Sequence, residues 1–135
     1  MAERERRIRE ELELLREVFP DLIYEPKGDW FQIPNDLRAL AVGWTPQPFP
    51  VAFHAQPNHP GQAPYGIYVR EDVKVGGSTP QNFNSSAGQK PPFPGVWGVL
   101  SWTIEGPWLP KEPAREGANL LNYALSFEER YRTCA

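Results

Sequence analysis

The sequence predicts an α+β domain in which a helix near each end of the chain flanks an antiparallel meander of four to five strands. Three observations support this prediction. Apolar residues recur at helical spacing near both ends, short β-type runs separated by turn residues lie between them, and a Pro- and Trp-rich extended segment precedes the last helix. The chain has 135 residues, of which 40% are hydrophobic, so it can bury one sizeable core. We therefore expect a single domain spanning residues 1–135.

A helix is predicted over residues 3–19. One apolar stripe repeats at the spacing of a helix face and comprises Ile8, Leu12, Leu15 and Phe19. Pro20 is expected to end the helix, because the residue before a proline avoids the helical region.

Four arginines lie in the first turns of this helix, namely Arg4, Arg6, Arg7 and Arg9. One interpretation is a solvated helix face, since Glu3 with Arg7 and Glu5 with Arg9 have the i,i+4 spacing of favourable ion pairs. The other is a docking surface for an acidic partner. The sequence leaves both open.

Short β-type runs follow the helix. They are Leu22–Glu25, Trp30–Ile33, Arg38–Trp44, Val51–Ala55 and Ile67–Val69. The turn-forming sequence Pro26–Asp29 joins the first two runs and predicts a hairpin. Because short turns connect successive runs, we expect an antiparallel meander rather than βαβ units.

Three further segments complete the chain. Gly76–Lys90 is rich in Gly, Ser, Asn and Gln, and predicts a long surface loop that is either a binding loop or a flexible spacer. Pro91–Pro110 holds five prolines and three of the five tryptophans, Trp97, Trp102 and Trp108. Many prolines disfavour a helix and many large aromatics disfavour disorder, so we expect a rigid extended segment crossing the core. A second helix is predicted over Glu116–Arg132.

Few residues suit catalysis or metal binding. His54 lies in a predicted strand and His59 in a turn, and a structural role is expected for both. The single cysteine, Cys134, lies at a chain end that is usually frayed, with no histidine near it in sequence. No metal site, cofactor or phosphate-binding fingerprint is predicted. Ser101 is a weak candidate nucleophile, and the alternative for it is a plain structural serine.

Charge and hydropathy limit the possible partners. The net charge of −3 gives no basic face for nucleic acid. The N-terminal residues lack the apolar core of a signal peptide, and no apolar run approaches the length of a membrane span. One cysteine forms no internal disulfide. We expect a cytoplasmic protein that does not bind membranes.

Several stretches resemble bacterial members of the ubiquitin-conjugating-enzyme (UBC) family. Gln56–Val69, QPNHPGQAPYGIYV, resembles the proline turn at the entry to the fourth strand of that fold, with Pro60 and Pro64 matching its prolines. PPFPGVWGVLSW followed by PWLP resembles the active-site stretch and its later Trp-x-Pro, matched by Trp108 and Pro110. GANLLNYALSFEERY resembles the helix that follows. The resemblance covers nearly the whole chain and implies a UBC-like fold.

The chain departs from this family at the catalytic position. The family's cysteine precedes the Trp-x-Pro and falls here on Val99, Leu100 or Ser101, none of which is a cysteine. A thioester carrier needs a reactive thiolate, which this stretch does not supply. Asn58-His59-Pro60 has letters similar to the family's His-Pro-Asn motif. It lies in the earlier proline turn, so the role of that motif is not transferred to it.

The resemblance therefore implies a non-catalytic adaptor in a bacterial ubiquitin-like conjugation pathway, with antiviral defence as one setting. Its partners would be a ubiquitin-like protein, the activating enzyme, or both. The family contacts its activating enzyme through the N-terminal helix. The expected partner-binding residues are Arg4, Arg6, Arg7, Arg9, Trp97, Trp102 and Trp108.

Two alternatives belong to other functional classes. In the first, the chain is an enzyme that carries the ubiquitin-like protein as an oxyester on Ser101. In the second, it is an unrelated module that grips a peptide or a sugar with its aromatic residues. Such a module needs free ring faces, so exposed side chains at Trp97 and Trp102 would favour it.

Overall fold

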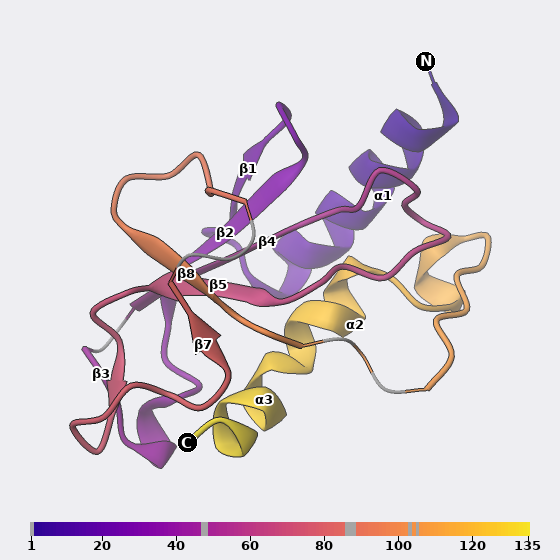
Figure 1. Cartoon of the computed structure of the whole chain (residues 1–135). Helices are drawn as coiled ribbons and strands as arrows, with labels where there is room; N and C mark the ends of the chain where they lie inside the picture. The colour runs from indigo at the N-terminus through magenta and orange to yellow at the C-terminus, as the bar shows by residue number, and fades with distance from the viewer. Residues whose placement is uncertain (1, 47–48, 86–88, 103, 105) are drawn as a thin grey trace.

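The computed structural model describes residues 2–46, 49–85, 89–102, 104 and 106–135. It confirms an α+β fold with a helix at the N-terminus and helices at the C-terminus. One antiparallel sheet has the strand order β1 (Ile23–Glu25), β2 (Trp30–Asp36), β4 (Phe49–His54), β5 (Ile67–Arg70), β8 (Trp97–Leu100) and β7 (Phe83–Asn84) (Figure 1). Two short strands, β3 (Trp44–Thr45) and β6 (Lys74–Val75), pair with each other separately.

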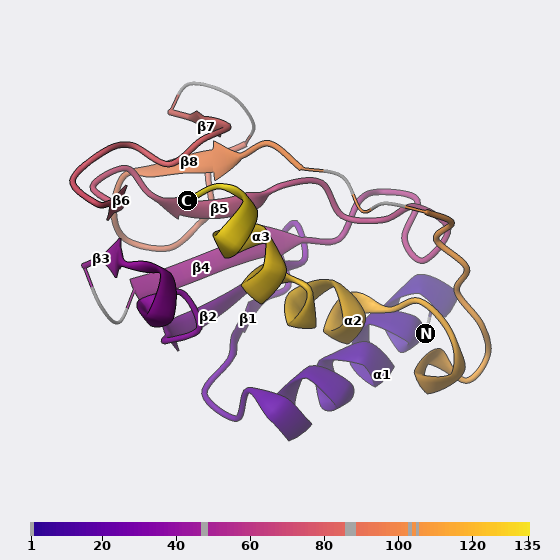
Figure 2. The ribbon, with the colours of Figure 1, turned by 90° about the horizontal axis from the view of Figure 1, so that it is seen from below.

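The helices α1 (Glu3–Val18), α2 (Leu120–Leu125) and α3 (Phe127–Thr133) lie together on one side of this sheet (Figures 1 and 2). The main core fills the space between the helices and the sheet. Its buried side chains include Ile8, Leu15, Phe31, Phe53, Ile67, Leu100, Tyr123 and Phe127. No described helix combines the length and the apolar character that a membrane span requires.

The predicted N-terminal helix and the first hairpin are confirmed. After α1 the Phe19 N–H still donates to the Leu15 carbonyl (2.8 Å), and Pro20 follows. In the turn between β1 and β2, Gly28 and Asp29 have φ values of +86° and +51°, a left-handed conformation that glycine adopts without cost. The four strands β1, β2, β4 and β5 then form the expected meander.

The prediction of a strand over Arg38–Trp44 is wrong. The chain turns after β2 because the Asp36 carboxylate accepts hydrogen bonds from the Arg38 backbone N–H (3.0 Å) and the Arg38 guanidinium (2.8 and 2.9 Å). A short 3-10 helix, η1 (Leu40–Val42), follows, and only Trp44–Thr45 is a strand. Burial raises the pKa of the Asp36 carboxyl, but Arg38 and the Tyr131 hydroxyl outweigh that effect and lower it. Local carboxylate bonding thus overrides the β-type composition of this run.

The C-terminal helix starts later than predicted and is broken. A 3-10 helix, η2 (Ala114–Glu116), precedes it, and Asn119 caps α2 by accepting the Asn122 N–H (2.8 Å). At Ser126 the hydroxyl donates to the Tyr123 carbonyl (2.6 Å), and α3 begins after this break. The expectation of a frayed end at Cys134 is also wrong. Its side chain is buried, and its carbonyl accepts the Gln81 N–H (2.8 Å).

The segments before the last helices contribute two strands that were not predicted. Phe83–Asn84, within the expected loop Gly76–Lys90, forms β7 at the sheet edge, and its partner β8 comes from the Trp-rich segment. Gly98 makes this pairing possible, because any Cβ there would collide with the Phe83 ring. Ser86–Gly88, Thr103 and Glu105 lie outside the described residues. The sheet therefore has six strands rather than four to five.

The face of the sheet away from the helices carries a second, smaller core. Successive strand residues point to opposite faces, so Val99 joins Trp30, Ala52 and Tyr68 on this face, whereas Leu100 enters the main core. Phe93 and Trp97 from the Pro-rich segment pack against this cluster. Both faces of the central strands are thus covered.

Candidate functional site

The three residues at the position of the family's cysteine, Val99, Leu100 and Ser101, differ in their surroundings. Val99 and Leu100 are buried on opposite sides of β8, in the two cores. Ser101 follows the strand and is partly exposed. Its backbone is held at both ends, because its N–H donates to the Asn82 carbonyl (3.0 Å) and its carbonyl accepts from the Arg130 guanidinium (2.7 Å). Of the three side chains, only that of Ser101 reaches the surface.

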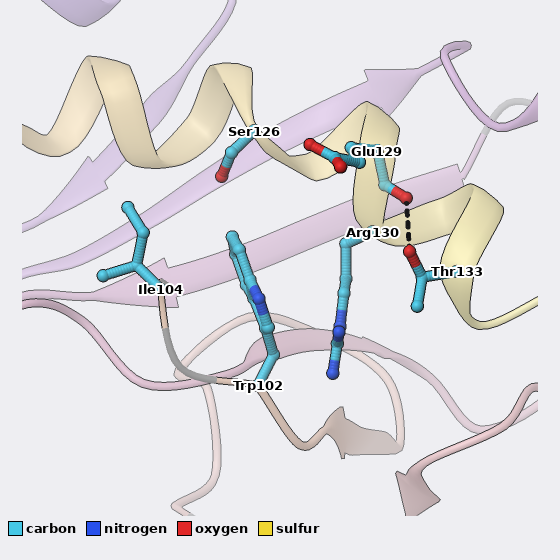
Figure 3. Close-up of a pocket in the computed structure, with 6 residues that line it drawn as sticks. All are labelled: Trp102, Ile104, Ser126, Glu129, Arg130 and Thr133. Atoms are coloured by element: carbon cyan, nitrogen blue, oxygen red, sulfur yellow. Dashed lines mark hydrogen bonds between the residues drawn. The ribbon is translucent and has the colours of Figure 1, made fainter. Parts of the chain in front are cut away.

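A cavity of about 210 Å³ lies directly after Ser101, between the Trp-rich segment and α3. Figure 3 shows the side chains that line it: Trp102, Ile104, Ser126, Glu129, Arg130 and Thr133. Its lining mixes apolar, hydroxyl and charged groups. The cavity therefore lies beside the position where the resemblance places the active site.

The Trp102 ring is held by an aromatic and a cationic contact. Tyr123 stacks on it at a centroid distance of 5.0 Å and an interplanar angle of 20°, and the Arg130 guanidinium carbon lies 5.5 Å from the ring centroid. Tyr123 is itself fixed, since its hydroxyl donates to the Gly66 carbonyl (2.8 Å). Burial raises the pKa of the Tyr123 hydroxyl well above its usual value. Trp102 is therefore a packed anchor whose partly exposed side chain also lines the cavity.

The two other tryptophans of this segment are anchors as well. The Trp97 indole N–H donates to the Phe93 carbonyl (3.1 Å), and the Arg70 guanidinium lies 4.9 Å from the Trp97 ring centroid. The Trp108 indole N–H donates to the Pro60 carbonyl (2.8 Å). All three tryptophans are only partly exposed. Trp97 and Trp102 are thus neither fully exposed nor buried, so the alternative of a peptide- or sugar-binding module stays open.

The only thiol of the chain is not available at this site. Cys134 has a relative exposure of 0%, and the Asn82 amide nitrogen lies 3.8 Å from its sulfur. Asn82 also accepts the Ser101 N–H, so the thiol lies close to the family's cysteine position but inside the fold. A buried thiol does not exchange acyl groups with a partner protein.

The four N-terminal arginines do not form one exposed basic face. Arg7 is buried, and its Nε donates to the Glu11 carboxylate at 2.7 Å. Arg4 pairs with Asp29, and Arg6 pairs with Glu3, Glu10 and Glu112. The expected Glu3–Arg7 and Glu5–Arg9 pairs are absent from the described contacts. Arg9 is exposed and has no ion pair within the described part of the chain, so the docking surface reduces to this one arginine.

Arg9 borders a groove of about 460 Å³ between α1 and the β1–β2 hairpin. The residues lining the groove are Ala2, Arg4, Glu5, Ile8, Arg9, Leu12, Tyr24, Pro26 and Asp29. The Tyr24 hydroxyl donates to Asp29 (2.6 Å), which fixes the hairpin side of the groove. This groove and the cavity beside α3 lie in different parts of the molecule (Figure 1).

A buried polar cluster that the sequence does not predict lies between α1, the proline turn and the start of α2. The Glu11 carboxylate has a relative exposure of 0% and accepts from Arg7, from His59 Nε2 (2.5 Å) and from the Leu120 N–H (2.6 Å). Burial raises the pKa of Glu11, but His59, Arg7 and the Leu120 N–H outweigh it and lower the pKa. Glu11 thereby joins α1 to the proline turn and to the start of α2. The one sequence signal was the i,i+4 spacing of Arg7 and Glu11.

His54 is structural, as expected, and it gives stability a pH dependence. Its ring stacks on Trp30 at a centroid distance of 4.4 Å, and burial lowers its pKa. The unfolded chain therefore binds more protons than the folded one as the pH falls below about 6.5, so the free energy of unfolding decreases there.

We expect His54→Gln to lose less stability than the wild type between about pH 7.5 and about pH 5.5, measured by urea unfolding at each pH. Both proteins retain His59, so the difference reports His54 alone. Equal losses in the two proteins would contradict the prediction.

The described residues contain no group of three or more His, Cys, Asp or Glu side chains that could hold a metal ion. Comparisons with models of protein families, with curated proteins and with solved structures found no match to this chain.

Proposed function

We propose that the chain is a non-catalytic UBC-like adaptor in the bacterial cytoplasm, which binds a ubiquitin-like protein, its activating enzyme, or both. The order of elements supports this proposal: α1, a four-strand meander, a long segment and C-terminal helices follow one another. The proline turn Gln56–Pro64 precedes β5, the fourth strand of the meander, which is its place in the resemblance.

The position of the single thiol in the fold favours a binding function over thioester chemistry. At the family's cysteine position Val99 and Leu100 are core residues, and Ser101 presents a hydroxyl instead of a thiol. The one cysteine of the chain is buried. A thioester carrier needs an accessible thiolate, so an adaptor is the function that this geometry supports best.

The groove along α1 is the proposed docking site. Ile8, Leu12, Tyr24 and Pro26 give it an apolar lining, and Arg9 at its border, which has no ion pair among the described residues, offers a positive charge to an acidic residue of the partner. Apolar contacts supply affinity at such a site, and a charge at the border supplies orientation.

We expect Arg9→Glu to weaken binding of a bacterial ubiquitin-like protein and of its activating enzyme by at least about tenfold, because it places like charges together. Affinities are measured by biolayer interferometry on the purified full chain. The charge-matched control is Arg132→Glu, an exposed arginine on α3 that should leave binding unchanged.

Replacing all four arginines would not test the groove. Arg7 belongs to the buried Glu11 cluster, so its replacement should destabilise the fold and would weaken binding for an unrelated reason. Unchanged binding by the folded Arg9→Glu variant would remove the groove from the proposal.

A second measurement separates the adaptor from the oxyester enzyme. The chain is incubated with the activating enzyme, ATP and the ubiquitin-like protein, and intact mass is recorded. The adaptor forms no adduct. An adduct that disappears in Ser101→Ala would overturn the non-catalytic proposal and establish transfer through the hydroxyl.

A further inference from the structure

Two opposite charges line the cavity beside Trp102 without being paired. Among the described residues, neither Glu129 nor Arg130 takes part in an ion pair, and the Arg130 guanidinium donates a hydrogen bond to the neutral Ser101 carbonyl. Their neighbours on the same helix, Glu128 and Arg132, do pair with each other at 3.2 Å. The cavity thus presents one acidic and one basic group to whatever enters it.

These charges point in different directions. Figure 3 shows the Glu129 carboxylate on the Ser126 side of the cavity, whereas the Arg130 side chain extends away from Glu129 and alongside Trp102. A ligand that satisfies both needs a positive group at one end and a negative group at the other. Figure 3 shows the two groups on different sides of the cavity, so a molecule with its charged groups at opposite ends, such as a dipeptide, suits them better than a free amino acid, in which both charged groups are attached to one carbon.

The two hydroxyl groups in the cavity lining, those of Ser126 and Thr133, offer a ligand hydrogen-bond acceptors but no donors. The Ser126 hydroxyl donates to the Tyr123 carbonyl (2.6 Å), and the Thr133 hydroxyl donates to the Glu129 carbonyl (3.1 Å). Each hydroxyl has one hydrogen, so only its oxygen remains for a ligand. Beside Glu129, the Ser126 oxygen therefore suits an ammonium group, and the guanidinium of Arg130 suits a carboxylate.

Size and the apolar wall complete the description of the ligand. The volume of about 210 Å³ is smaller than the range of about 300–1,000 Å³ that drug-sized ligands occupy. Trp102 and Ile104 provide an apolar surface for one side chain. We propose that this cavity binds a zwitterionic dipeptide with an apolar side chain, its ammonium at Glu129 and its carboxylate at Arg130. This proposal does not rest on the adaptor function.

Calorimetric titration of the full chain with glycyl-leucine, its N-acetyl derivative and its C-terminal amide tests the assignment. We expect glycyl-leucine to bind, and each derivative to bind at least about tenfold more weakly, because each removes one charged hydrogen bond. Glu129→Gln should weaken the binding of glycyl-leucine by a similar factor. The affinity of this variant should no longer differ between glycyl-leucine and its N-acetyl derivative. In the same way, the affinity of Arg130→Gln should no longer differ between glycyl-leucine and its C-terminal amide.

Glu128→Gln and Arg132→Gln are the matched controls, since they change the same charges on the same helix outside the cavity, and both should bind like the wild type. Glu129 is exposed, and its side chain makes no hydrogen bond or ion pair among the described residues, so its variant should fold even if Arg130→Gln does not. Absence of glycyl-leucine binding, equal binding of the derivatives, or unchanged binding by Glu129→Gln would each overturn the proposal.

Discussion

Replacing Glu11 with glutamine should lower the free energy of unfolding by about 3–5 kcal/mol, the cost of breaking a buried ion pair by removing one partner. The variant leaves the Arg7 guanidinium charged and buried without its acid. It also turns an amide N–H₂ toward the donors of Arg7 and His59, or else loses the acceptor for the Leu120 N–H. Urea unfolding followed by far-UV circular dichroism measures the change.

Glu13→Gln is the matched control, because Glu13 lies on the same helix but is exposed. We expect this variant to stay within about 0.5 kcal/mol of the wild type. The pKa of Glu11 is lowered in the folded state, so its contribution is present above the unfolded pKa of about 4.3 and is lost as the pH falls below it. The stability difference between wild type and Glu11→Gln should therefore shrink in acid. A loss below about 1 kcal/mol at neutral pH would contradict this account.

The parts of the fold that follow from local patterns could be predicted from the sequence. The α1 stripe and Pro20 determine a helix and its end, and the Pro26–Asp29 turn determines the first hairpin. The failed predictions have a common physical cause, since in each case a tertiary or side-chain bond overrode the local preference. At Arg38–Trp44 the Asp36 carboxylate turns the chain, and at Glu116–Arg132 the Asn119 cap and the Ser126 hydroxyl set the helix limits.

The candidate site was less predictable because it depends on long-range contacts. The sequence predicts that the Trp-rich segment crosses the core, and the structure places Trp102, the residue after Ser101, in the lining of a cavity. Its opposite wall is α3, and no local pattern indicates that Arg130 contacts the Ser101 carbonyl from a distance of many residues. The pairing of the N-terminal arginines also depends on long-range contacts. The acids that neutralise Arg4 and part of Arg6, namely Asp29 and Glu112, come from elsewhere in the chain.

Gly66→Ala should be among the most destabilising single substitutions outside the Glu11 cluster, because two separate costs add. Gly66 has a φ of +75°, a left-handed conformation that costs a residue with a Cβ about 1–2 kcal/mol. Its Cβ would also lie 2.5 Å from Val99 Cγ2 and 3.3 Å from the Leu100 carbonyl oxygen, and overpacking of this kind costs about 1–3 kcal/mol more.

Gly77→Ala separates the two costs. Gly77 has a similar φ of +84°, but a Cβ there meets nothing within 4 Å. We expect Gly77→Ala to lose only the backbone part, about 1–2 kcal/mol, in the same urea experiment. Equal losses of unfolding free energy in the two alanine variants would show that the contact of the new Cβ with Val99 costs no stability.

The double variant Gly66→Ala/Val99→Ala tests the steric part directly. Removing the Val99 methyl groups makes room for the new Cβ, so the double variant should lose less than the sum of the two single changes. Gly66 also donates its N–H to the Trp102 carbonyl and accepts the Tyr123 hydroxyl, both at 2.8 Å. A shift at Gly66 therefore displaces Trp102 and the Tyr123 ring that stacks on it. Gly66→Ala should lose glycyl-leucine binding at the cavity beside Trp102, and the double variant should regain it.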